Sequence, residues 1–124
     1  MSNIFNPLKK GWIIRLFREA RSDISASYDI EEPFISANLI IQSMKKMLKV
    51  LNFCLGDLEN IEELLFFRIN SSDQLYNLLF SFQNIINYWI QKNLSFEEID
   101  LSEILLDAKY LYNFTMIKLR FYVE

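Results

Sequence analysis

Carboxylates are the side chains of this sequence with the most evident capacity for chemistry, and two clusters of them are candidate sites. The clusters are Asp57, Glu59, Glu62 and Glu63, and then Glu97, Glu98, Asp100, Glu103 and Asp107. If one helix covers Asp100, Glu103 and Asp107, their spacing places them on one face. Such a face is a solvated helix start, a divalent-cation site or an acidic patch for a partner, and charge clusters are most often wet surface. Of the functional alternatives, we favour the acidic patch that faces a partner.

The motifs of common enzymes and metal sites are missing from the sequence. There is no histidine, which removes the commonest general base, the commonest metal ligand and the Glu-x-x-His motif of helix-bundle metal sites. Glycine occurs only at positions 11 and 56, so that no glycine-rich loop can hold a phosphate. We therefore predict a protein that is not an enzyme, binds no metal and uses no cofactor.

A basic segment near the start of the chain offers a different chemistry, the binding of anionic surfaces. The cations that could touch a membrane or phosphate are Lys9, Lys10, Arg15 and Arg18, and they surround Trp12 and Phe17. The same segment can instead pack its apolar face on the protein while its arginines pair with the acidic residues that follow, which are Asp23, Asp29, Glu31 and Glu32. The net charge of −3 also argues against a nucleic-acid binder. Attachment to a membrane or nucleic acid is therefore ranked below protein binding.

Aromatic residues near the end of the chain form a second candidate binding feature. They belong to a stripe at helical spacing that comprises Tyr110, Phe114, Ile117 and Phe121. Tyrosine and phenylalanine are enriched at the centres of protein interfaces, whereas apolar stripes of a helix usually pack inward. The stripe is therefore either core or partner surface, and we single out Tyr110, Phe114 and Phe121 as candidate partner-binding residues.

Five helices are expected to position these residues. Their predicted ranges are about 8–22 or slightly beyond, 33–55, 57–69, 72–92 and 102–122, each with apolar residues three and four positions apart. Pro33 is favoured in a first helical turn, and Gly56 is favoured just after a helix end. Ser95 and Glu98 have capping-box spacing, which predicts a further turn of helix in the connector before residue 102.

Composition indicates one helical domain that spans residues 1–124. Apolar residues make up 52% of the chain, which is enough for a core, while two glycines and two prolines are too few for a turn-rich β fold. We predict an all-α fold, a four- to five-helix up-down bundle in which the third helix is short. The helices over 33–55, 72–92 and 102–122 are expected to supply the central packing.

A cytoplasmic location is expected for this chain. Its single cysteine, Cys54, cannot form an internal disulfide and has apolar neighbours, which favours a buried thiol in a reducing compartment. The first residues lack the apolar run of a signal peptide. The longest uncharged run, residues 74–91, contains four internal amides that oppose insertion into a membrane.

The sequence therefore predicts a module that binds another protein by steric and electrostatic docking. An inhibitor, an immunity-type antidote and a small assembly subunit all fit this description, and the acidic residues from Asp100 to Asp107 would favour a basic partner. In size and charge the chain is similar to small acidic helical proteins that neutralise bacterial toxins. The alternative is a homo-oligomeric structural subunit that buries the aromatic stripe against its own copy.

Overall fold

The computed structural model describes residues 7–56, 72–95 and 98–123, with side chains for 10–53, 77–95 and 98–120. All regular structure in these residues is helical. The helices are α1 (Pro7–Ser27), α2 (Pro33–Gly56), α4 (Ser72–Leu94) and α5 (Leu101–Val123). The all-α prediction is confirmed, whereas the predicted short helix over 57–69 lies outside the described residues.

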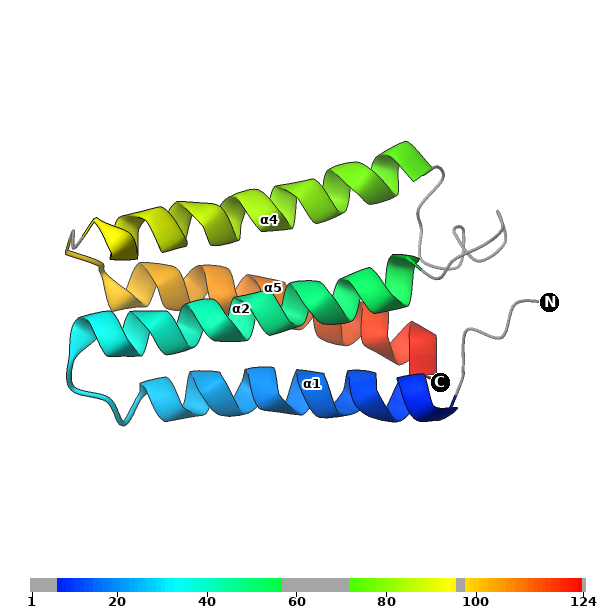
Figure 1. Cartoon of the computed structure of the whole chain (residues 1–124), viewed down its shortest axis with the longest axis horizontal. Helices are drawn as coiled ribbons and strands as arrows, with labels where there is room; N and C mark the ends of the chain where they lie inside the picture. The colour runs from blue at the N-terminus through cyan, green and yellow to red at the C-terminus, as the bar shows by residue number, and fades with distance from the viewer. Residues whose placement is uncertain (1–6, 57–71, 96–97, 124) are drawn as a thin grey trace.

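Helix α2 occupies the centre of the arrangement and packs against each of the other three helices. α1 and α4 lie on opposite sides of the pair formed by α2 and α5, and consecutive helices run in opposite directions (Figure 1). The turn after α1 and the connector after α4 therefore lie at the same end of the molecule (Figure 1).

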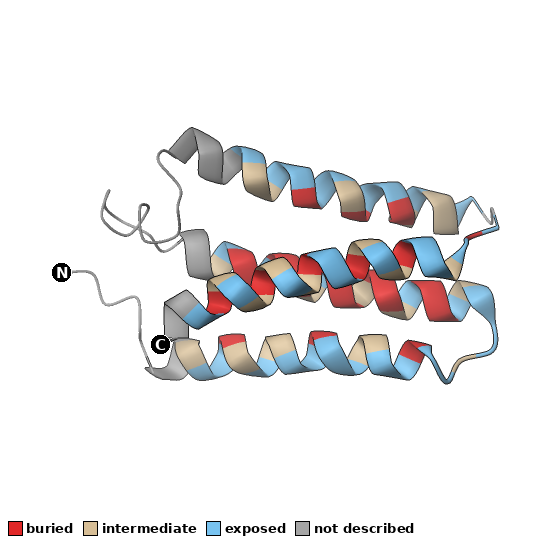
Figure 2. Ribbon diagram, turned by 180° about the vertical axis from the view of Figure 1, so that it is seen from behind, coloured by how far each residue is buried: buried red, intermediate tan, exposed pale blue. Residues whose placement is uncertain are grey.

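The core follows the apolar stripes that the helical spacing predicts, and the buried residues face the interior in Figure 2. On α2 the buried stripe includes Ala37, Ile40, Ile41, Met44, Leu48 and Leu51. On α4 it includes Phe82, Ile86 and Trp89, and on α5 it includes Ile104, Ala108, Leu111, Thr115 and Leu119. The burial of these residues stabilises the fold because apolar surface leaves water, at about 25 cal/mol per Å².

Small residues allow α1 and α2 to approach closely. Ala20 on α1 and Ser43 on α2 are fully buried, and the Ser43 hydroxyl donates a hydrogen bond to the Ala20 carbonyl oxygen at 2.6 Å. Near the turn, the buried Ser36 hydroxyl donates to the Ser27 carbonyl oxygen at 2.9 Å. These bonds satisfy hydroxyl groups that would otherwise be costly to bury.

α1 extends five residues beyond the predicted end at Ser22. Contacts with α2 explain the extension, because Asp23 forms an ion pair with Lys46 of α2 and Ile24 packs against the core. Tertiary contacts of this kind override the modest helix propensity of the serines in this segment.

Side chains at two helix starts cap the free backbone amides. Glu32 accepts a hydrogen bond from the Ile35 amide at 2.8 Å, directly before α2. Asp100 does the same for α5, because its carboxylate accepts a bond from the Ser102 amide at 2.9 Å. Ser95 closes α4 instead of starting a further turn, since its hydroxyl donates to the Gln91 carbonyl oxygen at 2.7 Å and residues 98–100 are not helical.

Candidate protein-binding surface

The second stripe of α5 is largely exposed. The exposed fractions are 60% for Tyr110 and 50% for Ile117, and Leu106, one turn before Tyr110, is 67% exposed. α5 lies nearest the viewer in Figure 2, where exposed positions follow the outer side of its ribbon. Three large apolar side chains on one helix therefore face solvent together, and we name this set, Leu106, Tyr110 and Ile117, the α5 apolar face.

The other two aromatic residues of the predicted stripe have different positions. Phe114 is half-buried, and its ring packs edge-on against Phe82 of α4 with 5.1 Å between the ring centroids. The side chain of Phe121 lies outside the described residues. Of the three aromatic residues predicted to bind a partner, only Tyr110 is thus described as exposed.

The three predicted acidic residues of this region take three different roles. Asp100 caps α5 and also accepts a bond from the Ser102 hydroxyl at 2.5 Å. The bonds from the Ser102 hydroxyl and amide lower the pKa of Asp100 below its ordinary value of 3.8, and the Glu103 amide and Lys92 add to this effect. Glu103 is exposed at the start of the helix, one turn before Leu106.

Asp107 connects α5 to α4. Its carboxylate accepts a hydrogen bond of 2.7 Å from the indole nitrogen of Trp89, whose side chain is only 3% exposed. A buried indole N–H needs such an acceptor, because it would otherwise lose its hydrogen bond to water. The sequence places Trp89 in a core stripe but gives no sign of this bond, because the two residues are 18 positions apart.

An acidic end emerges where the turn after α1 and the connector after α4 meet. Pro33 and residues 98–102 line one surface hollow there, and the Asn93 side-chain amide donates to the Phe34 carbonyl oxygen at 3.5 Å. Exposed carboxylates from both segments share this end: Asp29, Glu31, Glu32, Glu98, Asp100 and Glu103. Only the folded chain shows this grouping, since about 65 residues separate the two segments.

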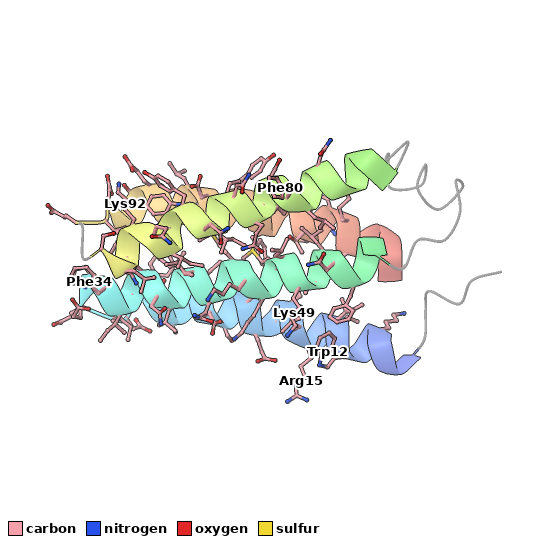
Figure 3. All side chains as sticks on the ribbon, turned by 45° about the horizontal axis from the view of Figure 1, so that its top comes forward. Trp12, Arg15, Phe34, Lys49, Phe80 and Lys92 are labelled. Carbon is pink, nitrogen blue, oxygen red and sulfur yellow. The ribbon has the colours of Figure 1, made fainter. Side chains whose placement is uncertain are left out.

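Of the predicted cations of α1, Lys9, Lys10 and Arg15 belong to the half of the helix that lies toward the opposite end of the molecule, whereas Arg18 is at its middle. Arg15 and Arg18 are exposed, Lys10 is half-buried, and the side chain of Lys9 lies outside the described residues. Arg15 points away from the helices in Figure 3, and its Nε lies 3.9 Å from a carboxylate oxygen of Glu19. Lys49, Lys118 and Arg120 add further positive charge near this end, because α2 and α5 both finish there.

The basic segment of α1, which could bind an anionic surface, also packs against the rest of the protein. The Trp12 ring lies edge-on to Phe53 of α2 at 4.5 Å between centroids, and the Lys49 ammonium lies 5.9 Å from the Trp12 ring centre. The cation next to Asp23 is Lys46, at 2.7 Å, rather than one of the arginines suggested by the order of charges along the chain. Lys46 also lies 3.9 Å from Glu19, so that the charges of α1 and α2 are complementary.

Two further properties concern metals and membranes. Within residues 7–56, 72–95 and 98–123, no three histidine, cysteine, aspartate or glutamate side chains come close enough to hold a metal ion. None of the helices in this part of the chain combines the length and the apolar character needed to cross a membrane.

Comparisons with protein-family models, with curated proteins and with solved structures return no match for this chain.

Proposed function

We propose that this chain is a non-enzymatic, cytoplasmic interaction module that docks on another protein through α5. The observation that carries the proposal is the α5 apolar face. Contiguous apolar residues on a surface mark sites of protein interaction, because their exposure to water is unfavourable until a partner covers them. Tyrosine is also enriched among the residues that contribute most to binding.

Charge supports a particular type of partner. Glu103 is one turn before Leu106 and two turns before Tyr110, so that the α5 apolar face continues into the acidic end. A partner that fits both parts has an apolar strip flanked by lysine or arginine residues. Complementary charge would set the orientation and the rate of binding, and the apolar face would supply most of the affinity.

The proposed mechanism is steric occlusion of the partner's surface. An inhibitor, an immunity-type antidote and an assembly subunit all act in this way, and the first two require that the covered surface is the partner's own functional site. For the scaffold we propose a four- to five-helix up-down bundle, with a short third helix over 57–69. In this scaffold, α2 anchors α5 and leaves its outer face accessible.

A photo-crosslinking experiment in cells of the source organism tests the docking surface. A benzophenone amino acid replaces Tyr110 in one variant and Ala26, an exposed residue of α1, in the control. We expect Tyr110 to capture a defined protein that Ala26 does not capture, and Leu106→Glu to abolish the capture. The captured protein is then purified, and Tyr110→Ala should weaken its binding at least about tenfold, as expected for a central interface residue. Equal affinity of the partner for the unmodified chain and for the Tyr110→Ala variant would contradict the proposal.

Self-association through the same face is the second candidate function. The exposure of Leu106, Tyr110 and Ile117 favours it equally, since a second copy could cover them. In this case Leu106→Glu would convert an oligomer into a monomer without any other protein present. Membrane or nucleic-acid attachment through Lys10, Arg15 and Arg18 is a weaker proposal, and binding that is lost with added salt would support it.

A further inference from the structure

Within the described part of α4, the outward side of the helix carries no charge from Asn77 to Gln91, about four turns. Residues 74–91 contain no lysine, arginine, aspartate or glutamate. By contrast, α1 exposes Arg15, Arg18, Glu19 and Arg21 over a shorter stretch. α4 also lies at the edge of the molecule, with α2 and α5 on one side only (Figure 1).

The exposed residues of α4 follow a regular seven-residue pattern. Asn77, Asn84 and Gln91 are spaced by seven, and a second series, each member three residues after a member of the first, comprises Phe80, Asn87 and Leu94. All six residues are exposed, and the exposed fractions of Phe80 and Leu94 are 57% and 67%. Alternating steps of three and four residues define the seam through which two helices pack in a coiled coil. We name these six residues the α4 seam.

We infer that the α4 seam packs against the α4 seam of a second copy of this chain, related by a twofold axis. Such an axis brings each residue near the axis close to its own counterpart, so that any charge there would face an identical charge. The α4 seam contains none. Its amides can both donate and accept hydrogen bonds, and they are therefore complementary to themselves.

The two α4 helices would pack antiparallel, because neighbouring helix dipoles then oppose each other. Asn84 lies near the middle of α4 and would therefore lie close to the twofold axis. Amides at the seam would fix the pairing of the two helices, as buried asparagines do in coiled coils, while Phe80 and Leu94 would supply apolar contact. This dimer leaves the α5 apolar face accessible and does not depend on the proposed function.

Solution mass measured by light scattering after size exclusion tests the inference. From about 1 μM to about 1 mM, a range in which moderate dimers dissociate, the chain should shift from its monomer mass of 14.9 kDa to twice that mass. Asn84→Glu should raise the dimer dissociation constant at least about tenfold, because two like charges would meet at the axis. Asn113→Glu makes the same change on the exposed side of α5 and should leave the constant unchanged.

Two mass results would overturn the inference, namely a monomer at every concentration, or a dimer that Asn113→Glu rather than Asn84→Glu dissociates. If the Asn84→Glu variant loses its helical circular dichroism, a cysteine variant at the same position tests the inference instead. Asn84→Cys should form a covalent dimer on mild oxidation, since residues near the axis come within the range of a disulfide. The unmodified chain, whose one cysteine is Cys54, gives the background, and Asn113→Cys is the matched control. Equal yields from the two variants would overturn the inference.

Discussion

α1 and α4 both flank the central pair of α2 and α5, but they attach to it in different ways. α1 packs through large side chains such as Ile13, but around Ala20 it also approaches α2 closely, with a buried hydrogen bond from the Ser43 hydroxyl to the Ala20 carbonyl oxygen. α4 attaches through the large buried side chains of Phe82, Ile86 and Trp89. Around Ala20 the contact of α1 therefore depends on a close fit of two backbones, whereas the contact of α4 depends on a few large side chains.

The difference determines which kind of substitution each contact tolerates. A close backbone contact has no room for added atoms, whereas a contact made by large side chains is sensitive to their removal. The contacts of α4 with α5 include the ring of Phe82 on Phe114 and the bond from Trp89 to Asp107. Large-to-small and small-to-large substitutions therefore separate the two modes of attachment.

The largest effect is expected from Trp89→Ala in α4. The substitution removes a buried aromatic side chain together with its bond to Asp107, and the free energy of unfolding should fall by about 3–5 kcal/mol. Urea denaturation measures this change. Tyr88→Ala is the matched control, because Tyr88 is the neighbouring residue and is 55% exposed. Similar losses for the two variants would show that α4 is not attached through its buried side.

The next effect is expected from Ala20→Leu in α1. Ala20 is fully buried against α2, so that the larger side chain forces the helices apart and should cost about 1–3 kcal/mol of unfolding free energy. Ala26→Leu makes the same change at an exposed position of α1, and we expect a change within about 0.5 kcal/mol there. Thermal unfolding of both variants checks the prediction, and a tolerated Ala20→Leu would contradict the close contact.

A smaller effect is expected from the charges between α1 and α2. In a double-mutant cycle, Lys46→Met and Asp23→Asn should show a coupling of about 0.2–1 kcal/mol, because the pair is 2.7 Å apart but partly exposed. High salt should reduce the coupling. The Arg15 and Glu19 pair, which is 3.9 Å apart and mostly exposed, should couple less strongly. The reverse order would mean that α1 is not held by this ion pair.

The smallest effect concerns the connector that joins α4 to α5. The Ser102 hydroxyl and amide bonds stabilise the charged form of Asp100 and lower its pKa in the folded chain. The resulting contribution to stability is complete above the ordinary pKa of 3.8 and is lost as the pH falls through the lowered pKa of the folded state. Ser102→Ala should raise the pKa of Asp100 toward 3.8, as measured by NMR titration of its carboxyl carbon. An unchanged midpoint would contradict this role of Ser102.

Much of the helical structure could be predicted because local signals specify it. Pro33 begins α2, and α4 and α5 lie within two residues of their predicted ranges. The buried stripe of α5 follows from spacing alone, since its members recur with the helical period. Whether its second stripe was core or surface stayed open, because a helix that is apolar on most sides does not reveal how many neighbours it has.

The candidate site was less predictable because its contacts join distant parts of the chain. The bond between Trp89 and Asp107 and the ion pair between Asp23 and Lys46 both cross from one helix to another. The acidic end arises from the antiparallel path of the chain, which brings Glu32 and Glu98 to the same end. The order of charges along the sequence cannot identify these pairs, because they depend on how the helices pack against one another.

The grouping of carboxylates at the acidic end has a consequence for encounters in solution. Six exposed carboxylates meet there, and the nearby cation that acts on Asp100 is Lys92. Their summed charge gives this end a local negative potential that extends about one Debye length into the solvent. A cationic surface would be attracted to this end before contact, so that productive collisions with it become more frequent at low ionic strength.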